Sequence, residues 1–338
     1  MYPFTAGKPT LIKPINPIVF RWGGEYSPSL TGPMNKGYSE PFPLPSTIAG
    51  FLYWIKKGYS TVTEEDELDM EKDYETISKE VELWGPLFYA KGRDAHGKEK
   101  VCIAVHEYPK KLRVINEECL STDRKSTWSL YPVYVNKIGI GHDVAKKQAH
   151  TEKGLIYTVE YIDYYATAKK MGLEEVEDYG ILVYTNFELK EDFYPFGSEG
   201  RVVEVKGVDK LNIKVPESQV FTLSPVILRA NESPLDLIIS SDTRKIVVDK
   251  HDNEEITLND VADGTLRLSL LGLGFNVKNR VKRPIYLALM PGEVGSTREK
   301  FKSLLDKLQE GLAENKLMKL GLFEKIWGSV LIGGGVSG

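Results

Sequence analysis

The pattern of apolar and polar residues predicts an α+β chain with more strand than helix. Runs that alternate between apolar and polar residues, or that are rich in β-branched and aromatic residues, are typical of strands. Such runs lie at residues 10–21, 101–108, 130–138, 155–162, 179–187, 202–206, 221–229, 245–248 and 283–290. The chain is therefore expected to be built mainly from strands.

Two segments have the spacing of helices instead. A helix is predicted to begin at Ser46, with that serine as its N-cap, and to end at Gly58. Its apolar residues recur at helical spacing: Ile48, Phe51, Leu52 and Ile55. A second helix is predicted near the carboxyl end, where Ser296 and Glu299 form a capping box and residues 301–312 carry one apolar face.

The composition is that of an ordinary globular protein, because 41% of the 338 residues are hydrophobic and 27% are charged. This apolar fraction can fill a sizeable core, so a wholly disordered chain is excluded. The two cysteines, Cys102 and Cys119, are too few for a disulfide scaffold or a cysteine-rich zinc module. No signal-peptide pattern begins the chain, and no apolar run approaches the ~20 residues of a membrane helix. We therefore expect a cytoplasmic protein that contacts no membrane.

Charge is unevenly distributed, although the net charge is only −4. Residues 61–82 contain ten acidic residues and two lysines, which is typical of a solvated insertion that is partly helical. Basic residues gather at 110–113, 124–125, 146–147 and 278–283, and they are interleaved with aromatic residues: Trp128, Tyr131, Tyr134 and Tyr161. A uniformly basic nucleic-acid-binding protein is excluded, but local binding of nucleic acid is a candidate function.

The familiar catalytic motifs are absent or incomplete. Residues 92–98 follow the spacing of a phosphate-binding P-loop, but Glu99 stands where a hydroxyl group would hold magnesium. A strand-like run follows instead of a helix, so we interpret this segment as a polar turn. The five histidines show none of the close spacings of a zinc site. We therefore expect no catalytic residue, no metal site and no cofactor.

Four segments spread over most of the chain carry a more specific signal. They are residues 12–24 (IKPINPIVFRWGG), 43–50 (PLPSTIAG), 137–141 (KIGIG) with 154–159 (GLIYTV), and 196–201 (FGSEGR). In order and spacing they resemble the third RAMP-type subunit of the type III-B (Cmr) CRISPR effector complex, the subunit that caps the crRNA at its 5′ handle. The chain departs from the family pattern at Trp22, where the family has an acidic residue, and at Ser198, where it has a glycine.

The resemblance implies two ferredoxin-like (RRM-type, RAMP) domains with insertions. The first is expected at residues 1–210, with an acidic insertion at about 61–100 and a protruding β-hairpin thumb at about 137–157. The second is expected at residues 211–338.

The resemblance also implies a set of RNA-binding residues. A helix start can hold a phosphate on its N–H groups, and a strand-end arginine can reach a phosphate or an unpaired base. Clustered lysines and arginines neutralise phosphates, and a histidine in the thumb is flat enough to stack on a base. For each residue, helix capping, an internal ion pair or a solvated surface position is the alternative. The predicted residues are Arg21, Ser46, Thr47, Lys137, Gly139, Gly141, His142, Lys146, Lys147, Gly197, Arg201, Lys278, Arg280, Lys282 and Arg283.

The function that the resemblance implies is that of a non-catalytic RNA-binding subunit. Its expected partners are the 5′ handle of crRNA, target RNA near the handle end, the large polymerase-like subunit and the backbone RAMP subunit. One alternative is a metal-independent endonuclease of the same superfamily, which would cut repeat RNA with His142 or His150 as general acid or base. The other is a protein scaffold that binds no RNA at physiological salt.

Overall fold

The computed structural model of the chain describes most of its first two thirds and parts of the rest. The described residues are 9–22, 36–58, 70–116, 119, 128–140, 142–143, 148–149, 156–197, 201–209, 211, 219–227, 229–230, 245–247, 255–257, 267–272, 275–276, 281–282, 285–293, 316–319, 323 and 325–332. Among them, strands outnumber helices and nearly all pairs of strands are antiparallel, so the expected α+β class is confirmed. No helix in these segments is long and apolar enough to cross a membrane.

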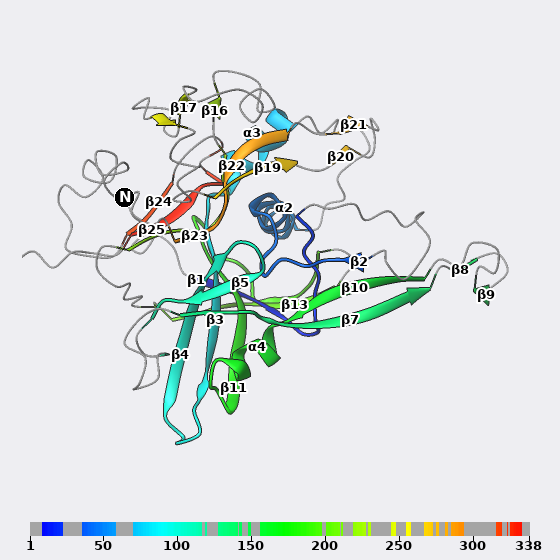
Figure 1. Ribbon diagram of the computed structural model, residues 1–338, viewed down its shortest axis with the longest axis vertical. Coiled ribbons are helices and arrows are strands. Elements are labelled where there is room, and N and C mark those ends of the chain that lie inside the picture. Colours follow the sequence, from blue (N-terminus) through cyan, green and yellow to red (C-terminus); the bar gives the residue numbers. More distant parts are fainter. Residues whose placement is uncertain are drawn as a thin grey trace, which may run out of the picture.

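The largest sheet has eight strands, and we call it the central sheet because the other described elements pack around it. It lies in the lower half of Figure 1. In spatial order its strands are β12 (Asp192–Phe196), β13 (Arg201–Gly207), β1 (Pro9–Pro14), β11 (Glu175–Thr185), β3 (Leu83–Arg93), β4 (Glu99–Glu107), β5 (Lys111–Val114) and β6 (Trp128–Leu130). Both β1 and β3 pair antiparallel with β11, so they run parallel to each other with β11 between them. The helices α2 (Pro45–Lys56) and α3 (Met70–Glu80) lie on the connection from β1 to β3, which makes β1, α2 and β3 a split β-α-β unit.

The middle of the central sheet is buried on both faces. Successive residues of a strand point to opposite sides, so each strand contributes to two cores. On β1, Ile12 packs in one hydrophobic cluster with α2 and with α4 (Tyr164–Lys170). Its neighbour Leu11 packs in a second cluster with Phe221 and Leu331, which come from strands late in the chain. The sheet therefore separates two cores, one on each side.

The later strands form smaller sheets. The first contains β23 (Gly292–Glu293), β14 (Val220–Thr222), β25 (Ser329–Ile332) and β24 (Lys316–Lys319). The second contains β15 (Val226–Ile227), β22 (Ile285–Leu289) and β19 (Leu268–Gly272). The others are β16 (Arg229–Ala230) with β17 (Lys245–Val247) and β18 (Glu255–Thr257), and β20 (Phe275–Asn276) with β21 (Val281–Lys282). Backbone hydrogen bonds from Leu83 to Lys325 and from Tyr108 to Pro291 join these strands to the central sheet.

A long β-hairpin projects from the molecule, as the resemblance implied (Figure 1). We call β7 (Val133–Ile140) and β10 (Ile156–Asp163) the thumb; their residues pair from Val133–Asp163 to Ile140–Ile156. The strand β2 (Lys36–Gly37) pairs with Thr158 and Val159 in the middle of β10, and Ile18 forms an isolated bridge with Ile162 at the base. The short strands β8 (His142–Asp143) and β9 (Gln148–Ala149) lie beyond its far end.

The helix predicted at 46–58 is present, but its predicted N-cap is wrong. The four apolar residues of its predicted face are buried. The N-cap is Leu44, which makes no side-chain capping bond, and Ser46 lies inside the first turn. The physical reason is Pro45, whose fixed φ suits the first helical position and whose missing N–H would have no helical partner there anyway. The helix predicted from the capping box at Ser296 lies outside the described residues.

Three predicted strands are broken or cut short. The run at 10–21 forms β1 only as far as Pro14. The run at 130–138 divides into β6 and β7 around Pro132, which lacks an N–H donor. The run at 221–229 divides into the short strands β14, β15 and β16.

The acidic segment is shorter than we predicted. Its described part includes α3, where Lys56 and Lys57 of the neighbouring helix bind the carboxylate of Glu80 at 2.9 Å each. Hydrogen bonds from Lys57 and Lys56 lower the pKa of that carboxyl to about 2. Residues 83–100, however, form β3 and the start of β4 in the central sheet, so they are not part of an insertion.

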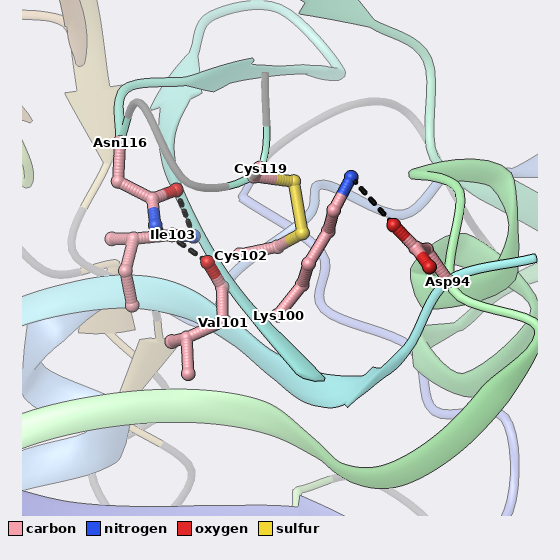
Figure 2. Close-up of a disulfide and its surroundings, with 7 residues drawn as sticks. All are labelled: Asp94, Lys100, Val101, Cys102, Ile103, Asn116 and Cys119. Atoms are coloured by element: carbon pink, nitrogen blue, oxygen red, sulfur yellow. Dashed lines mark hydrogen bonds and ion pairs between the residues drawn. A yellow bond between two sulfur atoms is a disulfide. The ribbon is translucent and has the colours of Figure 1, made fainter. Parts of the chain in front are cut away.

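The P-loop-like segment is a turn between β3 and β4, as predicted. The carboxylate of Asp94 accepts hydrogen bonds from the N–H groups of His96 (2.9 Å) and Lys98 (3.1 Å). Asp94 also forms an ion pair with Lys100 at 3.1 Å (Figure 2). The turn is thus closed by the side chain of its own aspartate.

A disulfide joins Cys102 on β4 to Cys119 and pins the segment that follows β5 onto the sheet (Figure 2). The side chain of Asn116 adds to this attachment, because it accepts from the N–H of Ile103 (2.8 Å) and donates to the carbonyl of Val101 (2.5 Å). The sequence excludes a disulfide scaffold, but it does not exclude this single bridge. Both cysteines are buried.

We expect loss of the disulfide to destabilise the fold. The bridge closes a loop of 17 residues, and the chain-entropy model gives about 3 kcal/mol for a loop of this size. The variant Cys102→Ala/Cys119→Ala should unfold at lower urea concentration than the wild type. Reductant should lower the stability of the wild type and leave the variant unchanged; a wild type that is insensitive to reductant would contradict the bridge.

We expect Gly180→Ala to lower the unfolding free energy far more than Gly50→Ala does. A Cβ at Gly180 would lie 2.3 Å from the carbonyl oxygen of Ile12, and the φ of 147° is rare for residues with a side chain. The clash should cost more than about 2 kcal/mol of unfolding free energy. Gly50→Ala is the matched control, because a Cβ there meets nothing within 4 Å and should stabilise α2 by about 0.5–1 kcal/mol. Equal effects of the two changes in urea unfolding would refute this account.

Candidate RNA-binding surface at the base of the thumb

Two cations lie over the ring of Tyr161, a buried residue of β10. Nζ of Lys137 lies 5.1 Å from the ring centroid, and the guanidinium carbon of Arg201 lies 5.2 Å from it. Lys137 comes from β7, opposite Val159, and Arg201 is the first residue of β13. Each contact of this kind is worth about 0.5–1 kcal/mol at an exposed site. The Tyr161 cluster, defined as Tyr161, Lys137 and Arg201, thus joins the thumb to the central sheet.

Aromatic packing positions the chain that leads to Arg201. Phe196 lies 5.9 Å from Phe20 and 4.4 Å from Phe51 of α2, measured between ring centroids. Gly197 follows with φ 73°, a conformation that a residue with a side chain adopts only at a cost. A Cβ there would lie 3.5 Å from Cδ1 of Ile18. The four segments that carry the family resemblance, or residues next to them, therefore meet around Phe196 and Tyr161.

Arg21 lies seven residues after the end of β1 at Pro14, so the prediction that it ends a strand is wrong. The segment before it is held by hydrogen bonds of Phe20. The N–H of Phe20 donates to Oγ of Ser39 (2.9 Å), and its carbonyl accepts from the N–H of Glu40 (2.8 Å). The side chain of Arg21 is exposed at the end of this segment. Trp22 donates from Nε1 to the carbonyl of Phe42 (2.6 Å), so the residue that replaces the family's acid packs inward.

A network of two carboxylates and one lysine connects the thumb to the central sheet. The carboxylate of Glu160, on β10, accepts from Nζ of Lys110 (2.5 Å) and from the N–H of Ser39 (3.4 Å). The carboxylate of Glu40 accepts from the backbone N–H of Lys110 (2.9 Å) and lies 3.2 Å from Nε2 of His106. Lys110 sits between β4 and β5, so it bonds to the thumb through its side chain and to the segment after β2 through its backbone.

Burial shifts the pKa of two groups beside this network, His106 and Tyr134. Burial lowers the pKa of His106, although Glu40 opposes this effect. His106 is therefore neutral near pH 7 and donates from Nε2 to Glu40, while its Nδ1 has no hydrogen-bond partner in the described part of the chain. Burial also raises the pKa of the Tyr134 hydroxyl well above its usual value. The ammonium group of Lys110 lies over the rings of Tyr38 (4.2 Å) and Tyr134 (5.4 Å).

The structure brings only part of the predicted RNA-binding set together. Arg201, Lys137 and Gly197 lie at the base of the thumb. Ser46 and Thr47 are exposed on the first turn of α2, and that helix packs through Phe51 on Phe196, five residues before Arg201. Gly139 pairs with Tyr157 in the thumb, and His142 and Lys282 lie in β8 and β21. Gly141, Lys146, Lys147, Lys278, Arg280 and Arg283 lie outside the described residues, as does His150.

Sequence reasoning missed the residues that hold this surface together. Lys110 belonged to a predicted basic cluster, but nothing indicated that its partner would be Glu160, fifty residues later. Tyr161 was noted only as one of several aromatic residues. The alternation of 155–162 predicts opposite faces for Glu160 and Tyr161, and this is the one signal that separates their roles. Within the described segments, no three His, Cys, Asp or Glu side chains are grouped to hold a metal ion.

We expect Glu160→Gln to loosen the thumb. The change leaves the half-buried Lys110 ammonium without its carboxylate, which should cost about 1–3 kcal/mol of unfolding free energy. Amide hydrogen exchange should rise in β10 and β7 more than in β3. Asp192→Asn is the control, because its ion pair with Lys190 is exposed and long (4.0 Å) and should change stability by less than about 0.5 kcal/mol. Equal exchange in both variants would contradict the role of Glu160.

Comparisons with known proteins agree with the resemblance seen in the motifs. No protein-family model matches the chain. A curated relative, the CRISPR system CMR subunit Cmr3 of Saccharolobus solfataricus, is 22% identical over 328 residues, which is 94% of each chain. A chain in the cryo-EM structure of the type III-B Cmr-beta complex bound to cognate target RNA and AMPPnP superposes with a TM-score of 0.51 at 14% identity, over 90% of each chain. This structural match shows that the two chains share a fold. The resemblance of this chain to the Cmr3 subunit of the type III-B CRISPR system, inferred from its motifs, is therefore confirmed.

Proposed function

We propose that this chain is a non-catalytic, RNA-binding subunit of a type III-B CRISPR effector complex and that it holds the 5′ handle of crRNA. The observation that carries the proposal is the Tyr161 cluster, in which cations from two of the matched segments converge at the base of a protruding hairpin. The relative named Cmr3 and the fold shared with a chain of an RNA-bound Cmr complex support it.

The proposed contacts follow from the chemistry of the surface. Arg201 can form paired hydrogen bonds with a phosphate, and Lys137 can neutralise a second phosphate. The exposed Arg21 is a third candidate for the same backbone. The thumb would lie across the RNA near the junction of handle and guide, where it would also meet target RNA. The basic cluster at 278–283 would add non-specific attraction for the same polyanion.

The proposed assembly also follows the resemblance. The chain would contact the large polymerase-like subunit and the backbone RAMP subunit, in the cytoplasm. We further propose two ferredoxin-like domains that meet near residue 210. The spatial order β13–β1–β11–β3, with β1, α2 and β3 as a split β-α-β unit, supports this for the first domain. The connection from β11 to β13 holds the strand β12, where a second helix of such a domain would be expected.

We expect Lys137→Gln/Arg201→Gln to weaken binding of handle RNA at least tenfold. Removal of two phosphate contacts should also reduce the slope of log K against log salt by about 1.4, at about 0.7 per contact with a single strand. Lys190→Gln is the control, because its side chain is 83% exposed and lies away from the cluster. Fluorescence anisotropy with a labelled repeat-derived RNA measures both quantities.

Experiments with the same RNA distinguish the proposed function from the two alternatives, an endonuclease and a protein scaffold. Unchanged affinity and salt slope in the double variant would contradict the proposed surface. Cleavage of the RNA by the wild type in EDTA would contradict the non-catalytic role and support the endonuclease. Absence of RNA binding at physiological salt would support the scaffold.

A further inference from the structure

An apolar patch lies exposed on the central sheet at its β12 edge. Ile15, Phe193 and Val202 are 44%, 59% and 44% exposed, and Pro195 is exposed beside them. The strand register places them together, because Pro195 pairs with Val202 and the N–H of Ile15 donates to the carbonyl of Val202. We call these four residues the edge patch.

The edge patch is on the face opposite to the Tyr161 cluster. Phe196 and Val203 are buried with α2 and α4, so the residues between and beside them, Pro195 and Val202, point to the other side. That other face is covered near its centre by Phe221 and Leu331, which pack on Leu11. The edge patch is therefore an exposed part of a sheet face whose middle is covered by the later strands.

The charges around the patch are unsuited to a polyanion. Lys13 pairs with Asp178 (3.1 Å) and Glu204 (3.8 Å), and Lys206 also binds Asp178. Burial opposes ionisation of Asp178, but hydrogen bonds from Lys206 and Lys13 lower its pKa, so the carboxylate is charged. Nearby, Lys190 pairs with Asp192, and Glu191 accepts from the N–H of Gly207. Three cations thus face four carboxylates, which disfavours RNA and favours an apolar protein surface with a basic rim.

The edge of the sheet favours docking on the face rather than addition of a strand. Pro195 has no N–H in the middle of the edge strand, so it cannot complete a ladder with another chain. An apolar centre surrounded by paired charges is instead the anatomy of a protein–protein interface. Four side chains form only the centre of such an interface, since a stable interface involves about 20–30 residues a side.

We propose that the edge patch is the apolar centre of the surface on which a neighbouring protein subunit docks. The proposal rests on the proposed function, because it takes the partner to be another subunit of the effector complex. The strand β13 then contributes to RNA binding and to docking. Arg201 belongs to the proposed RNA-binding surface on one face of the sheet, and the next residue, Val202, belongs to the docking surface on the other face.

The test compares variants of adjacent residues in a reconstituted complex. Val202→Glu with Phe193→Glu places two carboxylates among the acids of the patch, and both side chains are exposed, so folding should be preserved. Ile285→Glu is the matched control, because this apolar residue is 51% exposed on a different sheet. Each variant is mixed with the other purified subunits, one at a time and together, and with crRNA. Light scattering measures assembly, and anisotropy with handle RNA measures RNA binding by the chain alone.

We expect the patch variant to bind handle RNA as the wild type does while its affinity for one subunit falls at least thirtyfold. Arg201→Gln should show the reverse. Wild-type assembly of the patch variant, or an equal loss with Ile285→Glu, would overturn the proposal. So would a wild-type chain that is a dimer and becomes a monomer in the patch variant, because the occupant would then be a second copy. Loss of RNA binding in the patch variant would show that RNA lies there instead. If the wild type binds no RNA but the patch variant still fails to assemble, the proposed RNA role fails and the docking surface stands.

Discussion

The pairing of β11 with β1 and β3 is the constraint on which the rest of the structure depends. These strands are buried on both faces, and the backbone of β1 passes so close to Gly180 that no Cβ fits between them. Because the register of this pairing is fixed, the alternation of side chains assigns every residue of the neighbouring strands to one core or the other. A shift by one residue would exchange Ile12 with Leu11, and with them the surfaces for α2 and for the later strands.

The attachment of the thumb uses charge where a core would use apolar packing. Taking Lys110 and Glu160 out of water costs several kcal/mol per ion, and their attraction offsets this only with good geometry and further hydrogen bonds. The structure supplies these further contacts. The backbone N–H of Ser39 donates to Glu160, and the carboxylate of Glu40 accepts from the backbone N–H of Lys110. The rings of Tyr38 and Tyr134 lie against the Lys110 ammonium group. Such a network fixes the direction of the thumb relative to the central sheet better than apolar packing does, because hydrogen bonds depend on angle as well as distance.

Local patterns in the sequence predict the elements well and their partners poorly. The apolar positions of α2, the strands β4, β11 and β13 and the polar turn at Asp94 follow from spacing alone. The strand β3 does not, because the acidic run before it led us to predict an insertion as far as residue 100. The strands β5 and β12 were not predicted either. The N-cap at Ser46 is wrong because the effect of Pro45 on the first turn outweighs the capping preference of serine. The Tyr161 cluster joins residues 137, 161 and 201, and no periodicity connects positions that far apart. Only the family resemblance indicated that these segments act together.

The thumb is an arm whose support reaches far along its length. The strand β2 pairs with Thr158 and Val159, and Ile18 forms a bridge with Ile162, so β10 is held to the rest of the chain from its base to Thr158. The ion pair between Lys110 and Glu160 lies inside this held stretch. Only two residue steps of the described arm lie beyond Thr158, a length of about 7 Å at about 3.4 Å per residue, so a rotation of about 5° there would move Ile156 by less than about 1 Å. Bending of the described hairpin is therefore confined to its last two residue pairs.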